Sequence, residues 1–164
     1  MLNLSNIFRY FLQSDKILIP LSEELKIVRA YLDIERLRFG PRLQTMIQVD
    51  KQSEETLMIP VLSVQPLVEN AIKHGLSRRS EDGWLRLTAK STNGSLTITV
   101  EDSGPGSRPD SGLERQAGAG VGLANVTRRL QLCFGPGAGV DMQQGDFGTR
   151  VQFSVPLSAV PVNQ

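Results

Sequence analysis

Residues 85–102, LRLTAKSTNGSLTITVED, are the stretch that decides the fold of this chain. Apolar and polar side chains alternate on both sides of Asn93-Gly94, a pair of residues that favours a tight two-residue turn. Each half therefore predicts a strand with one buried face, and the two strands are expected to form a hairpin. The inward-facing positions of the second strand are apolar until the last one, which is Asp102.

Further helices and strands are predicted on both sides of this hairpin. Helices are expected at 1–16, 22–39, 63–75 and 120–134, and strands at 42–50, 140–144 and 149–155. Two Gly-Pro pairs are expected to stop helices, Gly40-Pro41 and Gly135-Pro136. Ser22 and Ser63 are candidate N-caps, and residues 103–120, rich in Gly, Ser and Pro, predict a long loop. Helices interspersed with antiparallel strand pairs favour an α+β fold, a two-layer α/β sandwich, over a doubly wound parallel sheet.

The composition is typical of one compact domain, because 40% of the 164 residues are hydrophobic and 21% are charged. A formal net charge of +1 provides no general attraction to nucleic acid or to an anionic bilayer. The single cysteine, Cys133, cannot form an intramolecular disulfide and is expected to be a small buried hydrophobic residue. No apolar run approaches the roughly 18 residues of a membrane-spanning helix, so the chain is expected to be soluble.

The predicted helix around LVENAIKHG, residues 67–75, carries the first candidate chemistry. Helical spacing places its polar residues on one side, and these are Glu69, Asn70, Lys73 and His74. An amide, an imidazole and an ammonium group on one face suit a single ligand, and an amide oxygen suits Mg²⁺. The alternative is a solvated face with an ion pair between Glu69 and Lys73. A single histidine excludes zinc sites that need two or more histidines.

Asp102 is the most informative single residue, because a carboxylate on the inner face of a sheet is unfavourable to bury without a partner. The local sequence places no basic residue near it, so the amine of a ligand is a candidate partner. Thr149 shares the inward parity of its own strand, while Gly104 and Gly106 permit close approach of a planar ligand. The alternative is a strand that simply ends in a Ser-Gly-Pro-Gly turn.

A second glycine motif, GAGVGL, places Gly118, Gly120 and Gly122 just before a predicted helix. Free backbone N–H groups at a helix N-terminus favour phosphate. The spacing is not the GxGxxG of a dinucleotide fold, and the chain contains no GxxxxGKS or GxxxxGKT loop. The motif therefore carries weight only together with the others.

The order NAxKHG, DSGPG, GxGxGL and a final GT resembles the N box and glycine boxes of the GHKL nucleotide-binding fold, also called the Bergerat type. Upstream, LSEELKIVRAYLDIERLRFG and PVLSVQPLVENAIKHG make the chain similar to LytS/YehU-type sensor histidine kinases. The resemblance runs from about Phe8 to Val155. It implies a C-terminal catalytic ATP-binding domain whose mixed, mostly antiparallel sheet is covered by helices. By this resemblance, residues 1–40 are the end of the dimerisation and phosphotransfer region with its leading helices, 41–157 are the ATP-binding domain and 158–164 are a tail.

The resemblance also implies ATP and Mg²⁺ as cofactors, held under a mobile lid at residues 103–118. Asn70 would ligate magnesium, and Asp102 would accept a hydrogen bond from the adenine amino group. Lys73, His74 and Asn125 would lie near the phosphates, and Thr149 would support the adenine end. The full set of implied ATP-binding residues is Asn70, Lys73, His74, Asp102, Gly104, Gly106, Gly118, Gly120, Gly122, Leu123, Asn125 and Thr149.

Two departures from the family pattern concern the catalytic step. The family transfers phosphate to a histidine on an upstream helix, and this chain contains no such histidine. A kinase fragment that cannot phosphorylate itself at the usual site is therefore expected. In related ATPases an acidic or polar residue lies four positions before the N-box asparagine, where this chain has Pro66. Glu69 is the candidate to orient a nucleophile.

The resemblance implies the cytoplasmic domain of a membrane-anchored, homodimeric protein. Its partners would be its own histidine-bearing helix and a response regulator, and not nucleic acid. Three alternatives stay open: a GHKL ATPase, an anti-sigma-type serine kinase, and a non-catalytic nucleotide-binding or dimerisation module. An ATPase needs a base that activates water, so Pro66 argues against the first. The stretch YLDIERLRFG favours the sensor kinases over the second.

Overall fold

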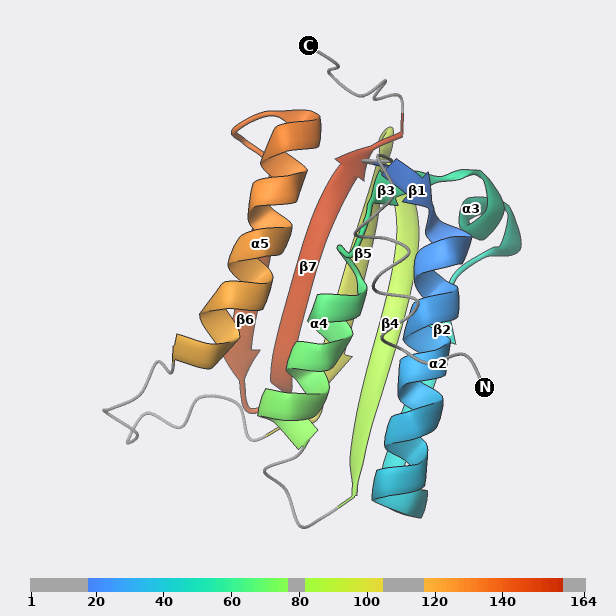
Figure 1. Ribbon diagram of the computed structural model, residues 1–164, viewed down its shortest axis with the longest axis vertical. Coiled ribbons are helices and arrows are strands. Elements are labelled where there is room, and N and C mark those ends of the chain that lie inside the picture. Colours follow the sequence, from blue (N-terminus) through green and yellow to red (C-terminus); the bar gives the residue numbers. More distant parts are fainter. Residues whose placement is uncertain (1–17, 77–81, 105–116, 158–164) are drawn as a thin grey trace.

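The computed structural model describes residues 18–76, 82–104 and 117–157, without the side chains of residues 52 and 117–120. The helix predicted at 1–16, the tail at 158–164, Gly106 and most of the predicted lid lie outside these residues. Within them, helices cover one face of a five-stranded sheet (Figure 1). The α+β two-layer sandwich expected from the sequence is therefore confirmed.

The sheet contains β2 (Leu43–Gln48), β4 (Gly83–Thr92), β5 (Ser95–Asp102), β6 (Val140–Gly145) and β7 (Gly148–Pro156). Their order across the sheet is β2-β4-β5-β7-β6. Strands β2 and β4 are parallel, and every other neighbouring pair is antiparallel. Since β5 is the middle strand, its last residue, Asp102, lies at the centre of one end of the sheet.

The hairpin of β4 and β5 turns at the predicted dipeptide. Asn93 and Gly94 have φ angles of 51° and 77°, and positive φ at both central residues is what a type I′ turn requires. The register that follows places Asp102 opposite Leu85. On its other side, the pairing of β5 with β7 places Asp102 opposite Thr149.

The helical layer consists of α2 (Leu21–Phe39), α4 (Gln65–Asn70) with its continuation η2 (Ala71–Gly75), and α5 (Ala117–Phe134), all in front of the sheet in Figure 1. The apolar core between the two layers includes Leu25, Leu32, Leu67, Ile72, Leu87, Ile98, Leu130 and Phe153. Cys133 is buried, as predicted. In the described residues, no helix is both long enough and apolar enough to cross a membrane.

Four short elements were not predicted, because each is shorter than a readable period of hydrophobicity. They are β1 (Leu18–Pro20), η1 (Gly40–Arg42), α3 (Lys51–Thr56) and β3 (Met58–Pro60). β1 and β3 form a separate antiparallel pair. α3 is capped by Asp50, whose carboxylate accepts a 2.8 Å hydrogen bond from the N–H of Ser53.

The two predicted serine caps are wrong. α2 begins directly after Pro20 and has no side-chain cap, so Ser22 lies inside its first turn. α4 begins after Val64, and the Ser63 hydroxyl has no hydrogen-bond partner in the described residues. A tertiary contact holds the turn before α4 instead, because Glu24 of α2 accepts from the N–H groups of Ser63 and Val64.

The predicted helix stops are confirmed, but one helix start differs. Gly40 and Gly135 follow α2 and α5 with φ angles of 61° and 94°. α5 starts at Ala117, inside the stretch predicted as a loop. Alternating small residues hid this start, since glycine carries no apolar side chain that would show a helical period.

Candidate functional site

Asp102 ends the middle strand with its side chain turned toward the helical layer, and only 2% of the residue is exposed. The predicted inward parity is therefore confirmed. Its Oδ1 accepts one hydrogen bond of 2.7 Å from the backbone N–H of Gly104. In the described part of the chain no basic side chain pairs with this carboxylate.

Burial raises the pKa of Asp102 from its ordinary value of 3.8 to about 6, and the N–H of Gly104 opposes this rise. The carboxylate is still mostly ionised at neutral pH, so it retains the capacity to accept further hydrogen bonds. Buried carboxylates are normally satisfied by several donors. An additional donor, such as an amine of a ligand, fits this unsatisfied group.

Three glycines pack directly around Asp102. A Cβ atom on Gly75 would lie 2.3 Å from Oδ1 of Asp102, and one on Gly104 would lie 2.6 Å from the same atom. A Cβ on Gly148, where φ is 112°, would lie 1.9 Å from the Asp102 carbonyl oxygen. The sequence interpretation assigned Gly104 to ligand approach. The structure adds that Gly104 is needed for the close approach of Gly75, whose Cα would be 2.6 Å from the same added Cβ.

Thr149 joins Asp102 at the same end of the sheet. It is 6% exposed and pairs directly with Asp102 across β5 and β7. The structure therefore brings together the two inward polar residues that strand parity predicted. They come from strands that are far apart in the sequence.

The polar face of α4 is only partly as predicted. Asn70 is 8% exposed, and its amide has no hydrogen-bond partner in the described residues. Glu69 forms an ion pair with Lys73 and also accepts a 3.0 Å hydrogen bond from Nε2 of Gln65. The ion pair between Glu69 and Lys73, which was the alternative to a ligand-binding face, is therefore present, and both carboxylate oxygens of Glu69 have hydrogen-bond partners. His74 is partly exposed.

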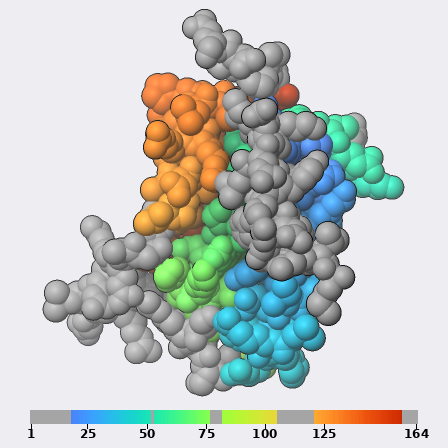
Figure 2. All heavy atoms as spheres, viewed as in Figure 1, coloured from blue at the N-terminus to red at the C-terminus, as the bar shows by residue number. Residues whose placement is uncertain are grey.

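The helix widens directly after Asn70. Residues Ala71–Gly75 form a π-helical turn, which the sequence did not predict. π-Helical turns are rare and frequent at functional sites. This turn ends at Gly75, against Asp102, so it connects the polar residues of α4 to the buried carboxylate. Figure 2 shows α4 and η2 at the molecular surface between α5 and α2.

The glycine motif lies in the first turns of α5 and not in a loop before it. Gly118 and Gly120 are within the helix. A Cβ on Gly122 would meet nothing within 4 Å, so the described residues give no packing reason for a glycine there. Leu123 packs on the core, Asn125 is exposed, and α5 packs against α4. No described side chain therefore covers the backbone of α5 at Gly122.

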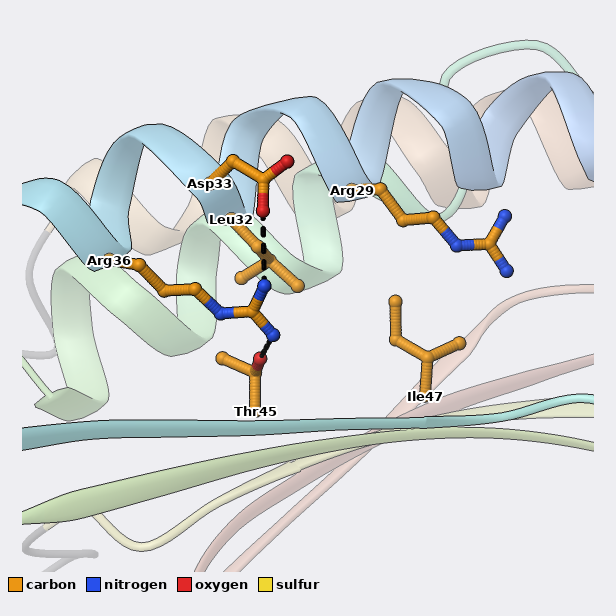
Figure 3. Close-up of a pocket in the computed structure, with 6 residues that line it drawn as sticks. All are labelled: Arg29, Leu32, Asp33, Arg36, Thr45 and Ile47. Atoms are coloured by element: carbon orange, nitrogen blue, oxygen red, sulfur yellow. Dashed lines mark hydrogen bonds and ion pairs between the residues drawn. The ribbon is translucent and has the colours of Figure 1, made fainter. Parts of the chain in front are cut away.

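A separate recess of about 280 Å³ lies between α2 and the edge strand β2 (Figure 3). Its lining residues are Arg29, Leu32, Asp33, Arg36, Thr45 and Ile47. Both arginines already have partners: Arg36 contacts Asp33 and Thr45, and Arg29 forms a 2.7 Å ion pair with Glu54. None of the residues predicted for the nucleotide lines this recess.

Sequence reasoning missed Gly75, Gly148 and Glu24. Gly75 and Gly148 stood inside the quoted motifs, as the last residue of NAxKHG and the first of GT, but their role depends on contacts with Asp102 that no local pattern reveals. Glu24 did leave a signal. It falls on the apolar stripe of α2 between Leu21 and Val28, where a charged residue is out of place.

The chain is similar to two protein families and to individual sensor kinases. The family of histidine kinase-, DNA gyrase B- and HSP90-like ATPases matches residues 60–159, and a histidine kinase family matches residues 1–43. Sensor histidine kinase YesM of Bacillus subtilis is 36% identical over 155 residues, which are 94% of this chain and 26% of YesM. Sensor protein LytS of Staphylococcus haemolyticus is 35% identical over 168 residues, covering 98% of this chain and 29% of LytS. The chain thus spans about a quarter of the length of these relatives.

Solved structures give the same result. The histidine kinase domain of the Erythrobacter litoralis EL346 blue-light activated histidine kinase has a TM-score of 0.63 and is 26% identical, covering 94% of this chain and 70% of that domain. The catalytic domain of histidine kinase ThkA has a TM-score of 0.62 at 14% identity, covering 87% of this chain and 97% of that one, which shows the shared fold alone.

The chain therefore belongs to the family of histidine kinase-, DNA gyrase B- and HSP90-like ATPases, and its fold is that of a histidine kinase catalytic domain. The resemblance to LytS-type sensor histidine kinases is confirmed. The relatives do not favour the ATPase, serine kinase or non-catalytic alternatives.

Proposed function

We propose that this domain binds Mg-ATP and presents its γ-phosphate to a histidine of the whole protein that lies outside this chain. The single observation that carries the proposal is the buried carboxylate of Asp102, which has one hydrogen bond and no basic partner in the described residues. The adenine amino group is a donor of the kind that Asp102 lacks. Thr149 supports the same end of the base.

The phosphates would lie between α4 and the start of α5. The bare backbone around Gly122 leaves room for them, and the N–H groups of the first turn of α5 favour negative charge. Lys73 would exchange its contact with Glu69 for one with a phosphate, and His74 and Asn125 would lie nearby. Gly118 and Gly120 keep side chains away from this approach.

Magnesium fits this site through oxygen ligands from the nucleotide and one amide. No group of three or more His, Cys, Asp or Glu residues in the described chain is arranged to hold a metal ion alone. Mg²⁺ usually binds phosphates and water with only one or two protein ligands. Asn70, whose amide has no hydrogen-bond partner among the described residues, is the proposed ligand, and the ion would neutralise phosphate charge during transfer.

The remaining features of the whole protein follow from the family. Glu69 is the proposed group that orients the attacking histidine, and it would first have to release Gln65 or Lys73. We further propose a homodimer anchored in the membrane, with this domain in the cytoplasm and a response regulator as the phosphate acceptor. A boundary near residue 40 between the phosphotransfer region and the ATP-binding domain belongs to the same proposal; it divides the chain by family motif, while α2 packs on the core of the ATP-binding domain.

Calorimetric titration with ATP and GTP in the presence of Mg²⁺ tests the nucleotide site. ATP should bind, and GTP should bind more weakly, because its exocyclic oxygen would face the acceptor Asp102. Asp102→Asn should weaken the binding free energy of ATP by about 1 to 3 kcal/mol, the range for mispairing a buried polar group. Asp141→Asn, an exposed aspartate on β6, is the matched control and should bind like the unmodified chain. Equal affinities for ATP and GTP would remove Asp102 from this role.

A further inference from the structure

Glu24 is a charged residue inside the helical layer that has no part in the nucleotide contacts described above. It lies in the first turns of α2, and none of it is exposed. Its Oε2 accepts hydrogen bonds from the backbone N–H groups of Ser63, at 2.9 Å, and of Val64, at 3.0 Å. Its Oε1 has no partner among the described residues. Glu24 therefore directs its carboxylate to one turn, the turn that precedes α4.

That turn has an unusual backbone. Leu62 has a φ of 53°, in the left-handed region that residues other than glycine seldom adopt. The N–H groups of Ser63 and Val64, which follow Leu62 directly, both donate to Oε2 of Glu24. Two successive N–H groups that converge on one oxygen form a small concave site for an acceptor. Glu24 supplies that acceptor and so stabilises this turn.

Arg129 holds the same turn from the opposite side. Its Nη1 donates a 2.8 Å hydrogen bond to the carbonyl oxygen of Leu62. Burial raises the pKa of Glu24 to about 7, and backbone hydrogen bonds from this turn and the nearby charge of Arg129 oppose this rise. The turn is therefore held at the N–H groups of Ser63 and Val64 by a residue of α2 and at the Leu62 carbonyl by a residue of α5.

We propose that Glu24, acting with Arg129, is a positioning residue for the nucleotide site. The two side chains fix the turn at residues 62–64, and this turn leads directly into α4, the helix that ends at Asn70. The proposal rests on the proposed function for its consequence, because Asn70 is there the magnesium ligand. It adds a link between α2, which lies within the region matched by the histidine kinase family, and the proposed site between α4 and α5.

Glu24→Gln and Arg129→Gln test this link, and each has a matched neighbour as control. Glu23 precedes Glu24 but is exposed and pairs with Lys26, so Glu23→Gln keeps the contacts of Glu24 with the turn intact. Arg128 is likewise exposed beside Arg129. Calorimetry with and without Mg²⁺ is the measurement. The two test variants should lose about tenfold in affinity for Mg-ATP, as expected when the support of a metal ligand is removed, and much less for ATP without metal. The fold loss in Mg-ATP affinity of the double variant should be smaller than the product of the two single losses, because both side chains act on one turn.

Two results would overturn the proposal. One is equal Mg-ATP affinity in Glu24→Gln and Glu23→Gln, and the other is a parallel loss with and without Mg²⁺, which marks a general structural defect. Amide hydrogen exchange of the nucleotide-free protein gives a separate readout. Residues 65–75 should exchange faster in Glu24→Gln than in Glu23→Gln. If the unmodified chain binds no ATP, the proposed function fails, and the exchange comparison alone decides the role of Glu24: unchanged protection of α4 would refute it.

Discussion

Asp102 and its nearest contacts hold most of the chemistry of this site at the scale of single residues. The carboxylate packs against Gly75 and Gly104 and accepts one backbone hydrogen bond, and Thr149 is the residue opposite Asp102 on the neighbouring strand. Gly75, Gly104 and Thr149, the neighbours of this carboxylate, carry no positive charge. A neutral donor of a ligand is therefore a better match for this carboxylate than any described side chain.

The raised pKa of Asp102 predicts a pH-dependent contribution to stability. Because its folded pKa of about 6 lies above its ordinary 3.8, the folded state binds the proton more tightly, and the resulting stabilisation is full below pH 3.8 and lost as pH rises to about 6. Asparagine cannot ionise. Relative to Asp102→Asn, the unmodified chain should therefore lose up to about 3 kcal/mol of unfolding free energy across this window.

Urea denaturation of both proteins between pH 4 and pH 7 measures that difference. Comparing the two proteins at each pH cancels the titration of the other carboxylates. A gap that stays constant over this range would show that burial does not shift the Asp102 equilibrium.

At the scale of elements, the decisive features are the π-helical turn η2 and the glycine-containing start of α5. The turn brings Gly75 against Asp102, and α5, which begins with the glycine motif, packs against α4. Both elements expose or approach backbone where an ordinary helix would present side chains. This is the property that close approach of a ligand requires.

Gly75→Ala should disturb the carboxylate directly. The added Cβ would lie 2.3 Å from Oδ1 and 3.1 Å from Oδ2 of Asp102, so the helix or the strand end must move. Overpacking of this kind costs about 1 to 3 kcal/mol in unfolding free energy, and ATP affinity should fall with it. Thermal denaturation and calorimetry measure the two effects. Gly137→Ala, in open space, is the control. Unchanged ATP affinity in Gly75→Ala would contradict the packing argument.

Gly122→Ala should separate stability from binding. No described atom lies within 4 Å of the added Cβ, and alanine is favoured over glycine in a helix by about 1 kcal/mol, so unfolding free energy should rise. If phosphates approach the bare backbone, ATP affinity should nevertheless fall. Denaturation and calorimetry on the same samples give both values. A more stable variant that binds ATP as well as the unmodified chain would place the phosphates elsewhere.

At the scale of the whole molecule, the two faces of the sheet have different roles. The inner face carries the core and Asp102, while the outer face carries Glu101 between Arg86 and Arg150, each with an N···O distance of 2.7 Å. α2 is part of the helical layer that packs on the inner face. Four of its side chains lie in the main core and are at most 1% exposed: Leu21, Leu25, Val28 and Leu32.

A chain that starts at Pro41 should therefore not fold cooperatively. Removing α2 exposes the core that its four buried apolar side chains cover. Burial of each such side chain stabilises the fold by about 1.5 to 3 kcal/mol. Their sum is comparable with the unfolding free energy of a whole domain, which is roughly 5–15 kcal/mol. It also removes Glu24 from the turn before α4. Circular dichroism melting of residues 41–157 against 18–157 measures this. A cooperative transition of the shorter chain would show that the ATP-binding unit is independent of α2.

Much of this architecture could be predicted, and the errors have a common cause. Alternation and the Asn93-Gly94 turn predicted β4 and β5 and the inward direction of Asp102, since those properties depend on neighbours along the chain. The serine caps were wrong because tertiary contacts fix the helix starts: Glu24 accepts from the N–H groups of Ser63 and Val64, and α4 begins after Val64. The start of α5 and the π-turn were missed because glycine and a five-residue turn leave no period to read.

The sequence by itself therefore determined the sheet parity, the motif order and the family, because each is encoded by spacing along one segment or by residues in a fixed order. Only the tertiary structure decided what surrounds the carboxylate. Gly75, Gly104 and Gly148 meet at Asp102, and side chains of α2 and α5 meet at the turn of residues 62–64, through contacts between segments that are distant in the chain. Such contacts depend on how the layers pack, and no local pattern specifies that packing.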